Sequence, residues 1–569
     1  YNELCLDIET DDSVPDWQHK ERWRHLAYAL VLRERDGTET RQSVLLDRES
    51  DAAERDMLRA LVPWLDRADI VYAWNGNPFD FPLMRARFRY HGIEYDWRHV
   101  IWCDLLTVWR RYHSRSAVTS FALDVLAPKV LDAPKIDWRA ESAVLGRRAE
   151  RMIDLYRWHP ELCRRYNEND VELLYQLEQR YGYAAADRIV GRLGNTFASD
   201  PYVGSKVDAL LLNRGGALGY HYLTRGLQLD ALPPELAARA RVPKKADDAE
   251  DSDARPDVTY AGAYVFPSVP GYHEGVACLD FRSLYPTTMM LFNISPETWV
   301  PASERARHDP DELTTTPSGA TFRKHGDGVI PLVFRETTEQ RRVYTKFQLA
   351  EPVGSKPFKR YERIAAAYKI TGLSFYGSLG HIGSRYYNPE VAEAVTLAGQ
   401  WFEKRTAELA ERHGYRIICG DTDSLYMPMT EAQARAFAAE CGPYYREIVR
   451  PFNVDMARFA MELEFETYFA ALVVTTKKRY AGLLTTFKGK PADHVEIKGL
   501  ECVRSDGLEF ARRMQRRVLD LILRRRRPPI AEIIALVEIE RARQRRDQRE
   551  GVVEDVVELS VEFTRGENL

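Results

Sequence analysis

The sequence predicts a multidomain protein that combines α/β and α+β parts. At 569 residues the chain is too long for one hydrophobic core and should divide into three or more domains. Its first third alternates strand-like and helix-like segments, which is typical of an α/β domain. Farther along, short apolar strands stand beside a tight turn and long helical stretches, which favours an α+β part.

The composition indicates a soluble globular chain. It is 45% apolar and 29% charged, and no apolar run reaches the roughly 18 residues of a membrane span. The seven cysteines are scattered and never form Cys-x-x-Cys, so neither a disulfide framework nor a zinc site is indicated. No secretory signal is visible. We therefore expect a cytoplasmic protein, or a protein of the nucleoid or of a host cytoplasm if the source is viral, with no membrane partner.

The first candidate element is a strand over residues 4–10. Alternation places Leu4, Leu6 and Ile8 on one face, and Asp7 and Glu9 together on the other. Two neighbouring carboxylates repel each other unless a cation lies between them, so this strand is a candidate metal-binding element.

Two further segments supply carboxylates. An apolar strand over residues 70–74 leads into Asn75-Gly-Asn-Pro-Phe79-Asp80, and Tyr166 and Asp170 lie four apart on one face of a predicted helix. Alone, the helical pair is equally well an ordinary exposed pair. With the other two segments it completes a set of four carboxylates and a phenol.

A second group of carboxylates lies in the C-terminal half. Residues 276–279 predict a buried strand that ends at Asp280, and a predicted helix follows over residues 287–292. Residues 419–424, Cys-Gly-Asp-Thr-Asp-Ser, predict a β-hairpin with Asp421 and Asp423 at its tip. Such a turn is also a common purely structural feature, because Asp favours turns. Together with Asp280, it is a ligand set for the two metals of an in-line phosphoryl transfer.

A predicted helix over residues 363–377 fits the same chemistry. Lys369, Leu373 and Tyr376 recur on one of its faces, and a cation beside an aromatic ring suits a triphosphate and a base pair. A lone helical lysine is otherwise a solvated side chain.

These segments resemble motifs A, B and C of family B DNA polymerases, in the family's order and spacing. Motif A is Asp280-Phe-Arg-Ser-Leu-Tyr-Pro, motif B runs from Lys369 to Gly377, and motif C is Gly420-Asp-Thr-Asp-Ser. Residues 477–480, Lys-Lys-Arg-Tyr, and 260–263, Tyr-Ala-Gly-Ala, resemble two further signatures of the family. Five motifs in the right order do not arise by chance.

The N-terminal set resembles the 3'-5' proofreading exonuclease of the same family. Asp7 and Glu9 match its first motif, Asp80 its second, and Tyr166 with Asp170 its third. The resemblance implies that the acids hold two metals and that Tyr166 orients the attacking water. It also implies that Asn75 and Phe79 contact DNA.

The resemblance implies an RNase H-like exonuclease domain and a right-hand polymerase with palm, fingers and thumb. The expected parts are an exonuclease domain at 1–185, a connecting segment at 186–270, palm at 271–330 and 377–475, fingers at 331–376 and a thumb that looks incomplete at 476–569.

The implied polymerase chemistry is template-directed addition of deoxynucleotides to a primer 3'-OH. Asp280, Asp423 and the carbonyl of Phe281 would bind the metals, Asp421 would support the turn, and Tyr285 would exclude a ribose 2'-OH. The remaining implied contacts are Ser283, Leu284, Arg342, Lys346, Lys369 and Tyr376 for the nucleotide, and Lys477, Lys478, Arg479 and Tyr480 for DNA. The cofactor is Mg²⁺, two ions per active site, and Mn²⁺ suits the same oxygen ligands.

The distribution of charge, and not the net charge, is consistent with binding to DNA. The net charge is −4, yet an acidic stretch at 247–257 and an arginine-rich stretch at 512–549 segregate the two signs. Such an arginine run is often a solvated helix face. Because it follows residues 477–480, where the resemblance places the thumb, we expect phosphate contacts. Primer-template DNA and dNTPs are the expected partners of a monomer, with a processivity clamp or other replication proteins as further candidates.

Three departures from the family qualify these expectations. Leu373 stands where motif B usually has Asn, and both chain ends look short, which suggests a fragment with weak processivity. Only 52 residues separate Lys369 from Asp421, which leaves little room for the insertion of protein-primed relatives. We therefore expect a nucleic-acid primer, with a terminal-protein partner as the alternative.

Two rival functions stay open. One is a nuclease whose polymerase half has decayed, for which Leu373 is the only support. The other is a non-catalytic DNA-binding scaffold. Loss of carboxylates usually marks such decay, and Asp280, Asp423 and the exonuclease acids are all present.

Overall fold

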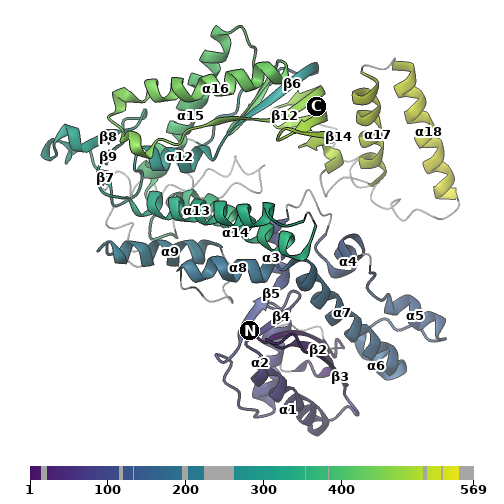
Figure 1. Ribbon diagram of the computed structural model, residues 1–569. Helices are drawn as coiled ribbons and strands as arrows, with labels where there is room; N and C mark the ends of the chain where they lie inside the picture. The colour runs from purple at the N-terminus through teal and green to yellow at the C-terminus, as the bar shows by residue number, and fades with distance from the viewer. Residues whose placement is uncertain are drawn as a thin grey trace. The chain divides into compact units, whose positions relative to one another are not determined.

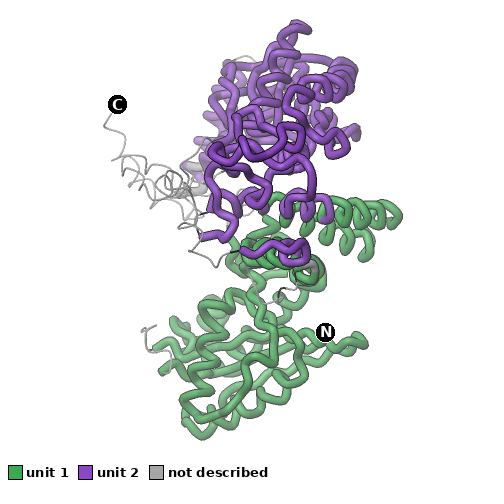
Figure 2. The backbone as a smooth tube through the Cα atoms, turned by 90° about the vertical axis from the view of Figure 1, so that its left-hand side faces the viewer, with its two compact units in different colours: residues 1–213, 337–374 green, residues 214–336, 375–569 purple. Residues whose placement is uncertain are grey.

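The computed structural model describes residues 1–13, 22–113, 120–131, 133–194, 196, 203–222, 262–352, 354–381, 383–503, 509–526 and 530–549. Two compact units make up the chain (Figure 2). One comprises residues 1–213 and 337–374, here called unit 1, and the other residues 214–336 and 375–569, here called unit 2. Tyr260, the acidic stretch at 247–257 and Arg527 lie outside the described residues.

Unit 1 is built on a five-stranded sheet in the order β3-β2-β1-β4-β5. Its strands are β1 (Glu3–Thr10), β2 (His25–Arg33), β3 (Glu39–Leu45), β4 (Ile70–Ala73) and β5 (Ile101–Asp104). The central strand β1 pairs antiparallel with β2 and parallel with β4, so the sheet is mixed. The strands expected at residues 4–10 and 70–74 are confirmed as β1 and β4.

Helices pack on both faces of this sheet. Leu4, Leu6 and Ile8 lie in one core with α1 and α2, and Cys5 lies in a second core with α3, α4 and part of α7. The helices of this part are α1 (Asp51–Arg67), α2 (Asp80–Tyr90), α3 (Leu105–Tyr112), α4 (Leu123–Leu131), α5 (Trp138–Val144), α6 (Met152–Trp158), α7 (Pro160–Tyr181), α8 (Tyr183–Gly191) and α9 (Val203–Ala217).

A long helical hairpin also contributes to unit 1. It consists of α13 (Val329–Leu349) and α14 (Lys356–Gly380), whose residues 337–374 belong to this unit. Tyr344 stacks on Tyr368 with ring centroids 5.7 Å apart, which joins the two helices. Apolar side chains of α14 pack in turn against α8. The helix expected at 363–377 is confirmed and extends in both directions.

Unit 2 is built on a six-stranded antiparallel sheet in the order β10-β11-β6-β12-β13-β14. Its strands are β6 (Gly271–Phe281), β10 (Cys419–Asp421), β11 (Ser424–Pro428), β12 (Leu463–Thr476), β13 (Arg479–Phe487) and β14 (Lys490–Lys498). The expected hairpin at 419–424 is confirmed as the turn between β10 and β11.

Helix α12 (Leu284–Leu291) corrects one expected boundary. The sequence placed its start at Thr287, after Pro286, whereas the helix begins at Leu284. Proline lacks a backbone N–H that the first helical turn would leave unpaired anyway, so Pro286 fits inside that turn. Ser283 precedes the helix in a left-handed conformation, with φ of 57°.

The remaining elements of unit 2 surround its sheet. Helix α16 packs on β12 and β6, α17 packs on β12 and β13, and α12 packs on α15 (Figure 1). Their bounds are α15 (Pro389–Arg412), α16 (Glu431–Ile448), α17 (Glu509–Arg525) and α18 (Ile530–Arg549), with a small sheet of β7 (Trp299–Val300), β8 (Leu313–Thr315) and β9 (Thr321–Arg323).

All seven cysteines are buried and free. Among the described residues, none of the helices combines the length and apolar character needed to cross a membrane.

Candidate active sites

The first candidate site forms where β1 meets α7 in unit 1. Strand β1 presents Asp7 and Glu9 on the face opposite Leu4, Leu6 and Ile8, and α7 presents Asp170. One carboxylate oxygen from each of the three acids lies within 4.8 Å of the others. The structure therefore brings together three of the acids that the sequence singled out, from segments about 160 residues apart.

The electrostatics of this cluster fit a cation. Burial and mutual repulsion raise the pKa of Asp7 and of Glu9 well above their usual values. Asp80, the first residue of α2, is 2% exposed, and burial raises its pKa to about 7, against hydrogen bonds from backbone amides of Asp80 and Ile8. A divalent ion between these oxygens would remove the repulsion, and hard oxygen ligands are those Mg²⁺ prefers.

Lys135 is a member of this site that the sequence analysis missed. Its Nζ lies 2.6 Å from Oδ2 of Asp170 and 4.8 Å from the centre of the Tyr166 ring. Burial raises the pKa of Asp170, against a lowering by Lys135 and a smaller one by the hydroxyl of Tyr166. Lys135 lies between α4 and α5 without a helical or strand pattern, so no periodicity could have marked it.

Asn167 is the second residue that the sequence analysis missed here. Its Nδ2 donates a hydrogen bond to Oδ2 of Asp7 over 2.6 Å, and the side chain is fully buried. The site opens into a cavity of about 830 Å³. Besides Asp7, Lys135, Tyr166 and Asp170, its walls include Trp74, Leu123, Asp124 and Trp138.

The loop between β4 and α2 holds the two expected DNA contacts of this unit. Asn75 has a positive φ of 63°, and its backbone N–H donates to Oδ1 of Asp104 over 3.1 Å. Asp104 also accepts from the backbone of Asn77, so the end of β5 fixes this loop. Phe79 is half-buried and meets Trp23 edge to face. Their contact with DNA stays a prediction.

The second candidate site lies on the sheet of unit 2, where β6 meets the β10–β11 hairpin. Asp280 of β6 lies opposite Ser424 in the ladder, and the backbone N–H of Phe281 donates to the carbonyl of Asp423 over 2.8 Å. Thr422 takes a positive φ of 62° at the tip of the turn. Main-chain hydrogen bonds thus hold Asp280, near the end of β6, beside Asp423 in the turn of the hairpin.

These two acids repel each other as metal ligands would. Burial, Asp423 and Glu466 raise the pKa of Asp280 to about 8, and burial, Asp421 and Glu466 raise that of Asp423 to about 6. The donor set of two carboxylates and the nearby Phe281 carbonyl suits an oxygen-seeking divalent ion. Glu466 of β12 was not predicted from the sequence.

The turn between β12 and β13 carries residues 477–480. Nζ of Lys478 lies 3.1 Å from Oδ1 of Asp421, so this turn is tied to the hairpin. Arg479 pairs with Glu501 at 2.8 Å, and Lys477 is exposed. Tyr480 is 5% exposed and hydrogen bonds to the hydroxyl of Tyr426 over 2.6 Å. The hydroxyl of Tyr480 is thus used inside the sheet, and the contact of Tyr480 with DNA stays a prediction.

The expected nucleotide contacts of unit 2 gather around the start of α12. Leu284 is buried, and the rings of Tyr285 and Tyr376 lie with centroids 5.0 Å apart at an angle of 56°. Tyr285 is half-buried and also approaches α15 at Gly399. The structure therefore brings Tyr285 and Tyr376 together, as one nucleotide pocket requires.

The remaining expected nucleotide contacts belong to unit 1. Arg342 and Lys346 lie one helical turn apart on α13, and both are exposed. Lys369 is exposed on α14, where Leu373 is 52% exposed. Their contact with a triphosphate stays a prediction.

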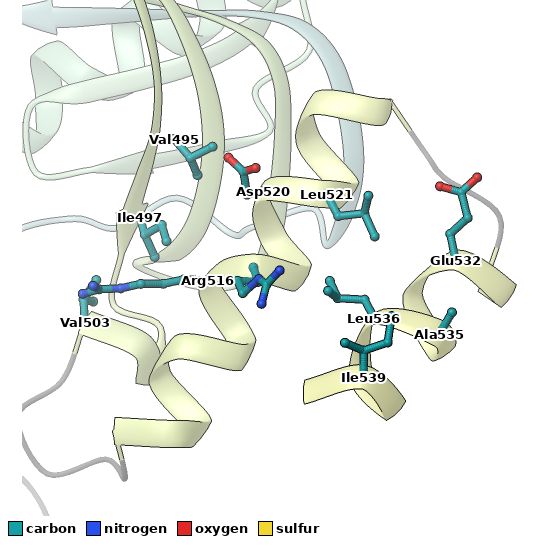
Figure 3. A pocket seen from close by; sticks show the side chains of 11 residues that line it. Val495, Ile497, Val503, Arg516, Asp520, Leu521, Glu532, Ala535, Leu536 and Ile539 are labelled. Atoms are coloured by element: carbon teal, nitrogen blue, oxygen red, sulfur yellow. The ribbon is translucent and has the colours of Figure 1, made fainter. Parts of the chain in front are cut away.

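A further groove lies between β14, α17 and α18 (Figure 3). It has a volume of about 860 Å³, with Val495 and Ile497 on one wall and Leu536 and Ile539 on another. The arginine-rich stretch flanks it, but part of its charge is used internally. Arg524 pairs with Asp493 at 2.7 Å and with Asp520 at 2.8 Å.

Both sheets and their carboxylates define the class of this protein. It combines an RNase H-like domain with a polymerase-type sheet that carries paired aspartates. A family model of the RNase H superfamily matches residues 4–182, and a model of DNA polymerase family B matches residues 230–566, more than half of the chain. The chain belongs to DNA polymerase family B.

Curated relatives and a solved structure agree with this family. A DNA polymerase of Archaeoglobus fulgidus is 32% identical over 482 residues, which cover 81% of this chain and 53% of the relative. DNA polymerase 2 of Aeropyrum pernix is 31% identical over 83% of this chain and 55% of the relative. The chain thus spans about half the length of these relatives.

The fold agrees as well. The structure of the family B DNA polymerase from the hyperthermophilic archaeon Pyrobaculum calidifontis matches 96% of this chain and 66% of its own, with a TM-score of 0.59 and 23% identity. The expected fold class, an RNase H-like domain with a family B polymerase fold, is confirmed.

Proposed function

We propose that this chain extends a primer 3'-OH by template-directed DNA synthesis and shortens 3' ends by exonucleolytic proofreading. The observation that carries the proposal is the presence of two separate clusters of acids, one in each unit, whose pKa values are raised by burial and by repulsion between neighbouring acids. Each cluster is a ligand set for divalent cations, and membership of DNA polymerase family B supports the pairing of the two activities.

The nuclease site would use Asp7, Glu9, Asp80 and Asp170 to hold two Mg²⁺ ions. Bound there, the ions would neutralise the scissile phosphate and favour ionisation of the attacking water. Tyr166 would orient that water through its hydroxyl, which hydrogen bonds to Asp170. Lys135, 2.6 Å from Asp170, would hold that carboxylate and add positive charge toward the phosphate.

The polymerase site would use Asp280, Asp423 and the carbonyl of Phe281 for two Mg²⁺ ions, and Mn²⁺ suits the same oxygens. The ions would supply charge stabilisation for in-line phosphoryl transfer to the primer. Asp421, which pairs with Lys478, would support the turn rather than bind a metal. Tyr285 would exclude the ribose 2'-OH, and Tyr376 would pack on the new base pair.

The other nucleotide contacts would come from Ser283 and Leu284 and from the exposed cations Arg342, Lys346 and Lys369. Lys477, Lys478 and Arg479 would bind the DNA backbone, with Asn75 and Phe79 at the nuclease site. We propose a nucleic-acid primer, a monomeric enzyme in the cell interior, and a processivity clamp or other replication proteins as further partners.

We also propose the division into an exonuclease domain, a connecting segment, palm, fingers and thumb. The sheet of unit 2 runs without interruption from β6 to β14, which favours a palm that extends to Lys498 and a thumb that begins beyond it. The α13–α14 hairpin would form the fingers.

The test is a gel of a 5'-labelled recessed primer on its template with Mg²⁺. We expect extension when dNTPs are present and 3' shortening when they are absent, and neither reaction after chelation of the metal. Shortening without extension would favour a nuclease whose polymerase half is silent. Binding of DNA with neither reaction would leave a scaffold as the function.

A further inference from the structure

Gly399 lies directly beneath the ring of Tyr285. A β-carbon at position 399 would lie 2.8 Å from Cε1 and 3.2 Å from Cδ1 of that ring, and 3.4 Å from Cδ2 of Leu284. Carbon atoms that are not bonded approach to about 3.5–4.0 Å. No side chain larger than hydrogen therefore fits at this position unless Tyr285 moves.

The glycine is not required by the backbone. Gly399 lies inside α15, which runs from Pro389 to Arg412, and alanine is ordinarily favoured over glycine inside a helix. Gly442, inside α16, differs from Gly399, because a β-carbon at position 442 would meet nothing within 4 Å. The close approach of Tyr285 is thus the physical reason for a glycine at position 399.

Packing restricts the movement of both α15 and the Tyr285 ring. Val395, Ala398 and Phe402 of α15 are fully buried, so the helix is held in the core. The Tyr285 ring also lies against Tyr376, at a centroid distance of 5.0 Å. Packed interiors transmit such a displacement instead of absorbing it.

We propose that Gly399 is a positioning residue that sets the position of the Tyr285 ring in the nucleotide pocket. A methyl group at position 399 would push the ring away from α15 toward Tyr376 and into the space that a nucleotide sugar would occupy. The inference rests on the proposed function, in which Tyr285 is the group that excludes ribose. It adds a residue that reaches the sugar only through that ring.

The experiment measures kcat and KM for a correct dNTP and for the matching rNTP with the full chain. The variants are Gly399→Ala, Tyr285→Ala, their double variant, and Gly442→Ala as the matched helical control. We expect Gly399→Ala to raise KM for the dNTP by about tenfold, the lower end of the effect of one methyl group in a packed pocket, with little change in kcat. Gly442→Ala should match the wild type.

The double variant is the decisive arm. If the methyl group acts only through the ring, the loss caused by Gly399→Ala disappears when Tyr285 is already alanine. An equal loss in both backgrounds would overturn the inference, because the methyl group would then disturb α15 itself. So would a Gly399→Ala variant that behaves as the wild type.

The outcomes also separate this inference from the proposed function. Unchanged sugar discrimination in Tyr285→Ala would refute the role of Tyr285 in excluding ribose. Melting temperature gives a readout that needs no activity. If Gly399→Ala lowers the melting temperature, the double variant should regain the wild-type value. A double variant that stays at the lower melting temperature would again overturn the inference.

Discussion

Glu403 is an acid that stays uncharged within the fold. It lies on α15, is 2% exposed, and its Oε2 has no hydrogen-bond partner among the described residues. Burial, followed by repulsion from Asp423, raises its pKa to about 9, against a smaller lowering by Lys404. At neutral pH the side chain is therefore protonated, beside the hairpin that carries Asp421 and Asp423.

This protonation predicts a pH-dependent stability difference. Because the pKa of Glu403 is higher in the folded than in the unfolded chain, folding takes up a proton between about pH 4.5 and 9. Its contribution to stability is complete below the unfolded pKa and is lost as pH rises toward 9. Glu403→Gln mimics the neutral acid and lacks this dependence.

The measurement is the free energy of unfolding by denaturant from pH 5 to 9. We expect the wild type to lose stability relative to Glu403→Gln as pH rises. Glu408→Gln, at a site on the same helix that pairs with Arg405 and is about half exposed, is the control. A constant difference between wild type and Glu403→Gln across this range would contradict the assignment.

At the scale of elements, α7 determines the geometry of the proposed nuclease site. One turn of this helix supplies Tyr166, Asn167 and Asp170, and the amide of Asn167 holds Asp7 on β1. Groups that orient a metal ligand typically contribute 10–100-fold to metal affinity or activity. We therefore expect Asn167→Ala to lower the 3' exonuclease rate by about this factor and to leave primer extension unchanged.

The matched control is Gln176→Ala, which removes an amide that hydrogen bonds to Glu172 on the same helix. Both rates are measured on one labelled primer with an exonuclease time course and an extension time course. Equal exonuclease rates in Asn167→Ala and the control would show that the hydrogen bond to Asp7 has no role in the reaction.

Local patterns explain which elements the sequence could predict. Alternation identified β1, a tight turn identified the β10–β11 hairpin, and the spacing of Tyr166 and Asp170 matched α7. The start of α12 was placed too late because Pro286 was taken as a boundary, although proline fits the first helical turn.

The missed residues depend on tertiary contacts instead. Lys135 meets Asp170, and Glu403 approaches Asp423, only after segments with no shared periodicity have packed together. Gly399 differs from the helical Gly442 by the tyrosine ring that a β-carbon would meet. Asn167 was the easiest of these residues to predict from the sequence, because it adjoins Tyr166 on a helix already assigned to the site.

At the scale of the whole molecule, the two acid clusters belong to different compact units (Figure 2). Each unit builds its cluster from its own strands: β1 with α7 in one, and β6 with the β10–β11 hairpin in the other. The two proposed reactions should therefore be separable by single substitutions.

The most direct measurement is the primer gel with Glu9→Ala and Asp280→Asn beside the wild type, each with and without dNTPs. We expect that Glu9→Ala extends the primer but no longer shortens it, and that Asp280→Asn shortens it but no longer extends it. If either substitution abolished both reactions while the melting temperature stayed at the wild-type value, two independent metal-dependent sites would be contradicted.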